Sequence, residues 1–258
     1  VDGIVPLGTT GESPTVSFDE HKEYIKNVVS MVNKRTKVIA GTGANSTEEA
    51  ICLSVEAEKA GVDGLLQVNP YYNKPTQKGL IQHFKTIADS VSIPIILYNI
   101  PGRSAVNFIP ENIAELVEVT SNIVAIKEAT GDLAQMQRVI ELCGNSLTLI
   151  SGDDNLLLPI LAIGGKGVIS VLSNLLPKDV KRVIELFNNG NITESREQFY
   201  KLLPLCRAMF FETNPIPIKA AMHLAGFCSK DIRLPMTELE VSNEELLKRA
   251  LNEYGVKL

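Results

Sequence analysis

The residue with the most distinctive chemistry in this sequence is Lys127. It lies near the end of the apolar run 122–131, which has the pattern of a strand that ends in a turn. Because a strand alternates its faces, Ala125 and Lys127 point one way while Glu128 points the other way. If the Lys127 face is the interior of a barrel, the loss of water disfavours the ammonium form and lowers its pKa. A partly neutral amine can form a Schiff base with a ketone, whereas in the alternative interpretation Lys127 reaches solvent or pairs with a carboxylate.

Three further segments with polar side chains follow predicted strands. Residues 8–13 (Gly-Thr-Thr-Gly-Glu-Ser) combine small residues with hydroxyls and would suit a carboxylate, or they form a plain capped loop. Residues 69–75 hold two tyrosines between prolines, and paired loop tyrosines are often interface anchors. Tyr98 lies on an inward strand face, where a phenol can pass a proton. Arg103 at the rim could hold a carboxylate in a bidentate fork, or it is only solvated.

Short β-branched runs alternate regularly with amphipathic stretches, which predicts parallel strands joined by right-handed helical crossovers. The predicted strands are 3–7, 37–40, 64–67, 94–98, 123–127, 147–150 and 167–170. The predicted helices between them are 17–32, 46–60, 77–89, 110–117 and 133–142. From residue 177 the pattern is wholly helical, with helices near 178–188, 195–211, 216–225 and 243–253.

Seven strands in this rhythm predict an α/β fold, a (β/α)8 TIM barrel that lacks its N-terminal strand and helix and carries a helical C-terminal extension. Residues 1–176 would form the barrel strands and helices, incomplete at the N-terminus, and 177–258 the last barrel helix and the extension, within one structural unit. A doubly wound sheet also tolerates seven strands. However, residues 41–46 lack the third glycine of a dinucleotide-binding fingerprint.

Composition restricts the class of protein and of partner. The 258 residues are 45% hydrophobic and 21% charged, which is typical of a globular protein. A net charge of −5 argues against nucleic acid or an anionic membrane as partner. The four cysteines lie far apart, with no metal-ligand spacing, so we expect reduced thiols in a cytoplasmic protein and no metal site. No stretch has the length of a membrane span, and the first residues lack the pattern of a signal peptide, so we expect no export.

Taken together, Gly-Thr-Thr-Gly-Glu, Tyr-Asn-Ile-Pro-Gly-Arg and Ile-Lys-Glu-Ala-Thr-Gly follow one another on successive strand ends. With 151–154, 167–171 and 214–219, they make the whole chain resemble the dihydrodipicolinate synthase family of class I aldolases, which includes N-acetylneuraminate lyase. The resemblance implies a Schiff-base condensation of pyruvate with L-aspartate 4-semialdehyde to 4-hydroxy-tetrahydrodipicolinate, the committed step of lysine and diaminopimelate biosynthesis. It implies no metal and no organic cofactor.

The resemblance also assigns roles around pyruvate. Lys127 matches the lysine that attacks the C2 carbonyl, and Tyr98 matches the general acid/base beside the imine. Thr10, with Thr9, matches the residues that hold the pyruvate carboxylate. Ile169 matches a backbone contact at the same site.

Further matches concern the second substrate and the assembly. Gly152 matches a residue whose small size leaves room for the reacting carbon. Thr9, Tyr98 and Tyr72 match a hydroxyl relay in which Tyr72 comes from a neighbouring subunit, so a homo-oligomer is expected, a tetramer or dimer in the family. Arg103 matches the arginine that receives the carboxylate of the semialdehyde.

Two alternatives remain open at this stage. The first is another pyruvate-dependent aldolase such as a sugar-acid lyase of the N-acetylneuraminate type, in which a non-basic residue usually replaces Arg103. The second is a truncated form with impaired activity.

Inhibition by L-lysine is a separate expectation. Five residues match polar positions of an allosteric pocket in the family: Ser13, His21, Asn45, Glu49 and Tyr71. Phe18 and Pro14 depart from the pattern of lysine-sensitive relatives, which leaves sensitivity open. In the alternative interpretation His21 and Glu49 belong to a solvated helix face.

Overall fold

A parallel β-sheet forms the centre of the chain. The computed structural model describes residues 1–258, and its six strands lie in the sheet in their order along the chain. They are β1 (Gly3–Ile4), β2 (Lys37–Gly41), β3 (Gly64–Val68), β4 (Ile95–Asn99), β5 (Ile123–Glu128) and β6 (Thr148–Ser151). Every pair is parallel, so the carboxyl ends of all the strands lie at the same end of the sheet. Side chains that follow the strands are therefore brought together.

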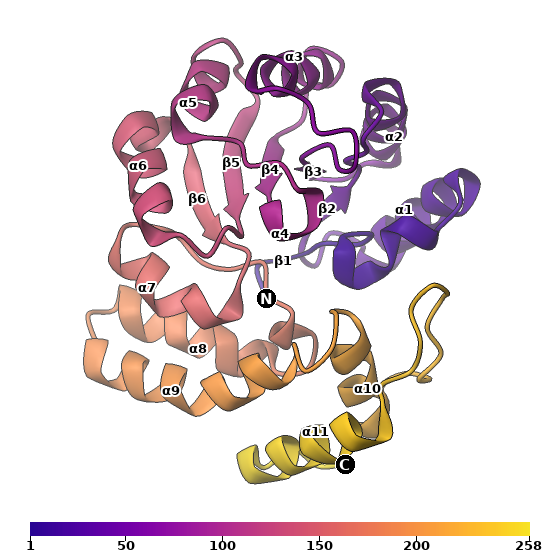
Figure 1. Cartoon of the computed structure of the whole chain (residues 1–258), viewed down its shortest axis with the longest axis vertical. Coiled ribbons are helices and arrows are strands. Elements are labelled where there is room, and N and C mark those ends of the chain that lie inside the picture. The colour runs from indigo at the N-terminus through magenta and orange to yellow at the C-terminus, as the bar shows by residue number, and fades with distance from the viewer.

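Helices cover one face of this sheet (Figure 1). They are α1 (Phe18–Val32), α2 (Thr47–Ala60), α3 (Gln77–Ala88), α5 (Pro110–Glu118) and α6 (Leu133–Cys143). Local sequence fixes where several begin. Ser17 Oγ accepts a hydrogen bond from the Glu20 amide at 3.3 Å, and the Glu20 carboxylate accepts one from the Ser17 amide at 2.9 Å, which completes a capping box at α1.

The main hydrophobic core lies between the sheet and these helices. Leu65, Leu97 and Ile126 point from the strands into it, and Phe84 and Met136 meet them from the helices, each no more than 1% exposed. Alternate residues of each strand face the helices, and the residues between them face the opposite side of the sheet. That opposite side is left for a second, smaller cluster, which carries the site described below.

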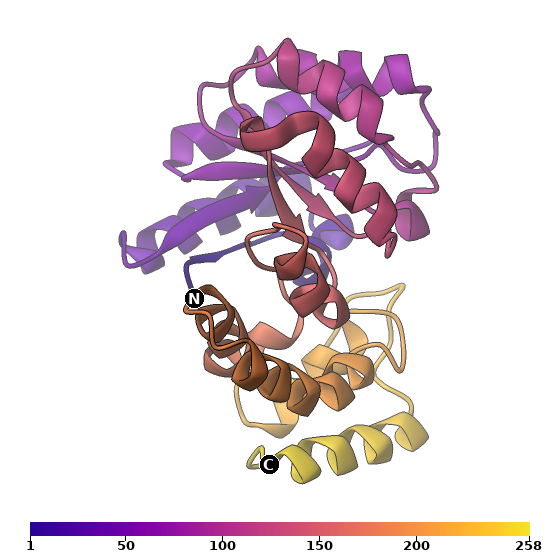
Figure 2. The same cartoon turned by 90° about the vertical axis from the view of Figure 1, so that its left-hand side faces the viewer.

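The C-terminal third of the chain is helical and packs at the other side of the sheet (Figure 2). Its helices are α7 (Leu157–Ala162), α8 (Pro177–Asn188), α9 (Ile192–Ala208), α10 (Ile216–Leu224) and α11 (Val241–Tyr254). They share a second hydrophobic core, centred on fully buried residues such as Leu172, Val183, Leu205 and Leu247. The N-terminal residues contact this helical layer, since Lys181 Nζ donates to Asp2 Oδ1 at 2.7 Å.

Short helical segments occupy the ends of several strands. α4 (Pro101–Ser104) follows β4, and η1 (Thr9–Gly11) and η2 (Ser13–Thr15) follow β1. The remaining 3₁₀ turns are η3 (Gly144–Ser146), η4 (Asp154–Leu156) and η5 (Leu172–Asn174). The segments that could do chemistry are thus held in compact turns.

The predicted fold class needs correction. Six strands form, not the seven expected, and β6 is followed by no strand at 167–170. That segment makes only an isolated bridge from Val168 to Ser151. It then turns, because the amides of Val171 and Leu172 donate to Asp154 Oδ2 at 2.9 and 3.1 Å, and η5 begins. The sheet is therefore open rather than closed into a barrel, with β1 and β6 at its edges. The domain boundary expected at residues 176 and 177 stays a prediction.

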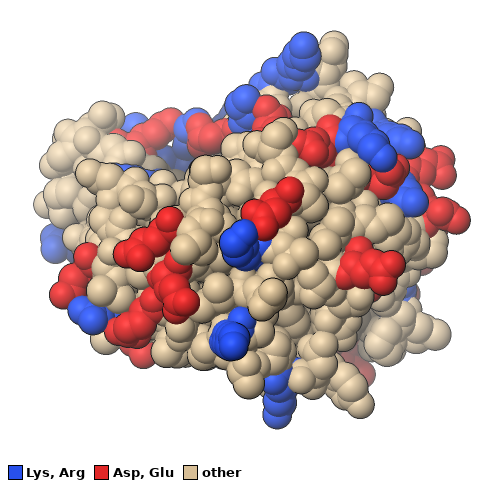
Figure 3. All heavy atoms as spheres, turned by 90° about the horizontal axis from the view of Figure 1, so that it is seen from above, with Lys and Arg blue, Asp and Glu red and all other residues tan.

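Acidic and basic side chains lie close together on the surface. Both signs are interspersed over the face seen in Figure 3. Several form ion pairs between elements, such as Arg138 with Glu111 at 3.0 Å and Lys37 with Asp63 at 2.7 Å. Exposed pairs of this kind contribute little to stability. None of the helices combines the length and the apolar character needed to cross a membrane.

Candidate active site

The inner face of the sheet forms an apolar floor beneath Lys127. Leu66, Ile96, Tyr98 and Ala125 make up this cluster, and Lys127 extends from the same face of β5 with only 9% of its surface exposed. Parallel pairing sets Tyr98 directly beside Lys127. The Lys127 Nζ lies over the phenol ring, 4.0 Å from its centroid. The lysine and its neighbouring phenol are thus one unit, fixed by strand register.

Burial changes the acid–base chemistry of Lys127. The loss of solvent lowers the pKa of its ammonium from 10.5 to about 8. The charge of Arg103 lowers it further, while the carboxylate of Asp154 opposes the shift. A usable share of the amine is therefore neutral, and nucleophilic, near neutral pH.

Tyr98 is buried as well, at 5% exposed. Burial raises the pKa of its phenol, and a hydrogen bond with the side chain of Thr9 and the charge of Arg103 act in the opposite direction. The phenol therefore stays protonated near neutral pH and can donate a proton. Thr9 follows β1 and Tyr98 lies on β4, and the fold brings these two side chains together.

Gly152 follows β6 and adjoins the lysine side chain. A Cβ at this position would lie 2.6 Å from Ala129 Cβ and 3.1 Å from Lys127 Cε. Only glycine fits against the lysine without displacing a neighbour. Ile169 lies on the same side, part-buried at the edge of the apolar floor, and its amide donates to the Ser151 carbonyl at 2.9 Å.

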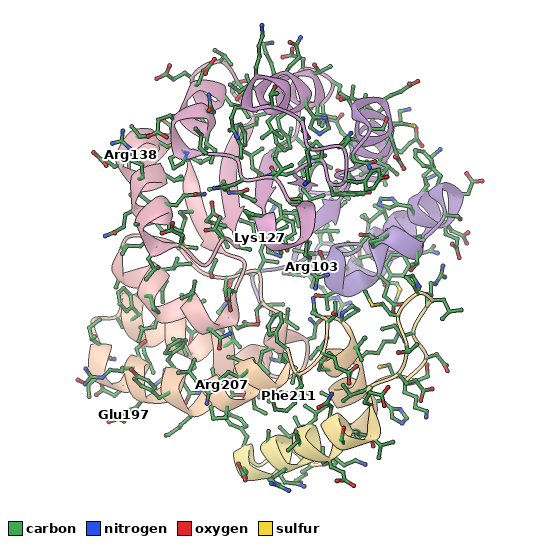
Figure 4. All side chains as sticks on the ribbon, in the orientation of Figure 1. Arg103, Lys127, Arg138, Glu197, Arg207 and Phe211 are labelled. Atoms are coloured by element: carbon green, nitrogen blue, oxygen red, sulfur yellow. The ribbon has the colours of Figure 1, made fainter.

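Two candidate carboxylate-binding side chains meet through Asn214. Its amide Nδ2 donates to Thr10 Oγ1 at 3.1 Å, and its backbone carbonyl accepts from Arg103 Nη2 at 2.9 Å. Asn214 is 5% exposed, so these hydrogen bonds are shielded from solvent. Figure 4 shows Arg103 and Lys127 near one another at the end of the sheet that faces the C-terminal helices. Hydroxyl, guanidinium and amine are therefore supplied to one region.

Sequence reasoning missed two residues of this region. Asn214 was noted only as part of a motif, since nothing local shows that residue 214 reaches residue 10. Asp154 was noted in the same way, yet it is 3% exposed, holds the loop that carries Ile169 and acts electrostatically on Lys127. A carboxylate in the turn after a buried strand was the only available signal.

Tyr72 is the one predicted catalytic residue that does not join the others. It is 90% exposed and has a left-handed backbone with φ of 74°. A tyrosine held outward in this way does not contribute to the site of its own chain. Its predicted role therefore depends on a second chain.

The predicted allosteric residues gather only in part. Asn45 Nδ2 donates to the Tyr71 carbonyl at 3.1 Å. Burial raises the pKa of the Tyr71 phenol, and the charge of Glu49 acts in the same direction. His21 is instead buried, and its Nε2 lies 2.8 Å from the Gly41 carbonyl. The interpretation of His21 as part of a solvated helix face is therefore wrong. No hydrogen bond joins Ser13 to the other four.

The chemistry of the site follows from these groups. It holds a nucleophilic amine, a protonated phenol, hydroxyls on a tight loop and a guanidinium. No group of three or more His, Cys, Asp or Glu side chains is arranged to hold a metal ion. The combination suits covalent attack on a carbonyl compound that also carries a carboxylate.

Comparison with known proteins agrees with this chemistry. The model of the dihydrodipicolinate synthetase family matches residues 1–254. A curated 4-hydroxy-tetrahydrodipicolinate synthase from Leptospira biflexa is 56% identical over 260 residues, covering 99% of this chain and 88% of that protein.

Solved structures of similar proteins give the same result. A dihydrodipicolinate synthase from Aquifex aeolicus superposes with a TM-score of 0.99 and 46% identity, covering 100% of this chain and 88% of that one. A dihydrodipicolinate synthase from Cyanidioschyzon merolae, described as having lysine bound, superposes with a TM-score of 0.96 and 43% identity, covering 99% of this chain and 87% of that one.

The Aquifex comparison also corrects the predicted fold. A barrel defined by the loss of its first strand and helix is not supported, because the whole of this chain superposes on the known structure. The α/β architecture described above is shared over its full length. The match of residues 1–254 and the identity of about half show that the chain belongs to the dihydrodipicolinate synthetase family.

Proposed function

We propose that this chain condenses pyruvate with L-aspartate 4-semialdehyde to 4-hydroxy-tetrahydrodipicolinate, as the names of its relatives indicate. This is a step in lysine and diaminopimelate biosynthesis. The observation that carries the proposal is Lys127, a buried amine whose pKa is lowered to about 8 beside a buried phenol. Such an amine has no structural use in an apolar cluster, because burying it costs stability.

The first half of the reaction uses Lys127 and Tyr98. The neutral amine attacks C2 of pyruvate, and the carbinolamine loses water to give a protonated imine. Tyr98, whose ring lies beside Nζ, donates the proton that the departing hydroxyl needs and can take one back. The imine withdraws electrons, so a C3 proton leaves and an enamine forms.

The second half joins the two substrates. The enamine carbon attacks the aldehyde carbon of the semialdehyde, and the aldehyde oxygen takes up a proton. The amino group of that substrate then attacks the imine carbon and displaces Lys127, which closes the ring and regenerates the free amine. Gly152 leaves the space beside Lys127 Cε that the growing adduct requires.

Carboxylate recognition orients both substrates. Thr9 and Thr10 would hold pyruvate, with the backbone at Ile169 as a further contact. Arg103, anchored on the Asn214 carbonyl, would hold the semialdehyde carboxylate in a charge-assisted pair. The shared anchor keeps the two binding groups at a fixed separation.

A second copy of the chain would complete the proton path. Tyr72 is 90% exposed and would be supplied to the site of a neighbouring subunit, next to Thr9 and Tyr98. L-lysine would act as an inhibitor at Asn45, Glu49 and Tyr71. The lysine-bound relative supports this part of the proposal.

Trapping with borohydride tests the function directly. The protein is mixed with pyruvate, reduced with sodium borohydride, and examined by intact mass and peptide mapping. A single adduct on Lys127, absent from Lys127→Ala, is expected. A folded wild-type protein without this adduct would exclude the proposed reaction.

Arg103 favours the synthase over the second candidate, a sugar-acid lyase. Both reactions pass through a pyruvate imine, so trapping alone does not separate them. Turnover assays with the semialdehyde and with sialic acid do. Faster turnover of sialic acid would assign the lyase reaction instead.

A further inference from the structure

Behind the site, the opposite face of the sheet carries three polar side chains in a row. Asn69 directly follows β3, Asn99 ends β4 and Glu128 ends β5. They are 1%, 1% and 0% exposed, although most of this face packs against apolar side chains of the covering helices. We refer to Asn69, Asn99 and Glu128 as the buried polar row. Polar groups are costly in such a position unless they are paired.

Each member of the row stands next to a residue of the site or its loops. Asn99 follows Tyr98 and Glu128 follows Lys127. Strand pairing aligns Tyr98 with Lys127 and Asn99 with Glu128. The same pair of strand ends therefore carries reactive groups on one face and the row on the other.

Hydrogen bonds run along the row from strand to strand. Asn69 Nδ2 donates to Asn99 Oδ1 at 2.8 Å, and Asn99 Nδ2 donates to the Glu128 carboxylate at 3.1 Å. Glu128 also accepts from the Thr130 amide at 3.0 Å, which fixes the turn after β5. Side chains thus tie three consecutive strand ends together.

A second layer of amides holds the row from outside. Asn107 Oδ1 accepts from Asn99 Nδ2 at 2.9 Å and from Gln135 Nε2 at 3.0 Å. Gln135 Nε2, on α6, also reaches Glu128 Oε2 at 3.4 Å. These bonds run from the active-site edge to the covering helix.

We propose that the buried polar row is a positioning device, in which Glu128 and Asn99 fix the ends of β4 and β5 so that Lys127 and Tyr98 keep their mutual geometry. This inference rests on the proposed function. The row touches no substrate, and it acts through the two residues that do.

Glutamate is the residue type that the pattern requires. Asn99 Nδ2, Gln135 Nε2 and the Thr130 amide are all donors, and only a carboxylate presents acceptors to all three. A glutamine at 128 would set its own NH₂ against Asn99 or Gln135. Rotating those amides would break their bonds to Asn107 and Asn69, so the row has one consistent arrangement.

The test is Glu128→Gln, which keeps the shape and removes one acceptor. We expect kcat to fall about 10-fold or more, because a small misplacement of reacting groups slows the reaction strongly. The rate at which the pyruvate adduct forms, measured by borohydride trapping, should fall by a similar factor. The KM for pyruvate should change less than about twofold, because Thr9, Thr10 and Ile169 lie on other elements.

A matched control is Ser54→Ala. Ser54 is fully buried on α2, donates to the Ala50 carbonyl at 2.6 Å and accepts from Gln67 Nε2 at 2.8 Å. It also loses buried hydrogen bonds, but away from β4 and β5. Its Tm should fall while kcat and KM stay at the wild-type values.

The outcomes separate the explanations. A kcat for Glu128→Gln equal to that of wild type, or a loss matched by Ser54→Ala, would overturn the positioning role. If Glu128→Gln does not fold, Gln135→Met is used instead, since it removes one donor from the part-buried outer layer. A kcat reduced about twofold or more at unchanged KM would support the positioning role of the buried polar row, whereas an unchanged kcat would overturn it. Failure of wild type to trap pyruvate would reject the proposed function instead, so the two failures are distinguishable.

Discussion

The lowered pKa of Lys127 makes a quantitative prediction about the pH dependence of adduct formation. With a pKa of about 8, roughly one amine in eleven is neutral at pH 7, whereas about one in 3,000 would be neutral at the ordinary 10.5. The site thus raises the concentration of the nucleophile roughly 300-fold at pH 7. The initial rate of imine formation should be higher by a similar factor, because it is proportional to the concentration of the neutral amine.

The shape of the profile is the test. From pH 6 to pH 9 the neutral share should rise about 90-fold and then level off, whereas an ordinary lysine would rise about 1,000-fold and keep rising. Protein is mixed with pyruvate for short fixed times, quenched with borohydride and analysed by intact mass. Circular dichroism at each pH confirms that the fold is intact, and Lys127→Ala gives the background.

Asp154→Asn supplies the matched perturbation. The two backbone amides that Asp154 holds both donate to Oδ2, and Oδ1 has no partner. An asparagine can keep both bonds, so the main change at this position is the loss of the negative charge. Because the carboxylate raises the pKa of Lys127, its removal should move the midpoint of the profile to lower pH.

Two results would refute this reasoning. One is a wild-type rate that continues to rise through pH 10, since the amine would then titrate as if it were exposed. The other is a midpoint that moves upward in Asp154→Asn, which would mean that desolvation and charge do not control the nucleophile.

Three other substitutions test separate parts of the site. Lys127→Met should stabilise the protein at pH 7 by up to about 3 kcal/mol, because the pKa of Lys127 is lower in the folded than in the unfolded state. The cost of burying the ammonium is complete below about pH 8 and disappears as the pH rises towards 10.5. Denaturant unfolding at pH 7 and near pH 10.5 measures this difference. Equal stability of the two proteins at pH 7 would contradict it. Gly152→Ala should cut kcat roughly 100-fold in a folded protein, because its Cβ falls 3.1 Å from Lys127 Cε, and steady-state kinetics with near wild-type kcat would exclude this crowding. Arg103→Met should keep the pyruvate adduct but raise the KM for the semialdehyde about 10- to 100-fold, the effect of losing a charged hydrogen bond; loss of the adduct itself would instead assign Arg103 to the pyruvate step.

Much of the local structure was predictable from the sequence. The helices predicted from residues 17 and 46 begin there, with Ser17 and Ser46 as the N-caps of α1 and α2. Strand alternation predicted that Lys127 and Glu128 point to opposite faces, and Glu128 is indeed bonded to side chains on the helix side. These features depend only on neighbours in the chain, so short-range patterns carry them.

Closure of the sheet was not predictable in the same way. Residues 167–170 have the composition of a strand, but the capping of η5 by Asp154 ends their pairing with β6 after an isolated bridge. α7 was also missed, since a six-residue apolar helix has too few turns to show a period. At 167–170, competition between local propensity and a distant hydrogen-bond partner decided the outcome, whereas at α7 the segment was too short to show a period.

By itself, the sequence determined the alternation of the first six strands with helices, the types of reactive side chain and their positions at strand ends, because spacing along the chain encodes these. Only the tertiary structure decided that Asn214 joins Thr10 to Arg103 across more than a hundred residues, and that Tyr72 faces outward. Only folding removes water from Lys127 and sets its Nζ over the Tyr98 ring. A pKa reflects solvent and charge in three dimensions, so the reactivity of this lysine belongs to the fold and not to the motif that contains it.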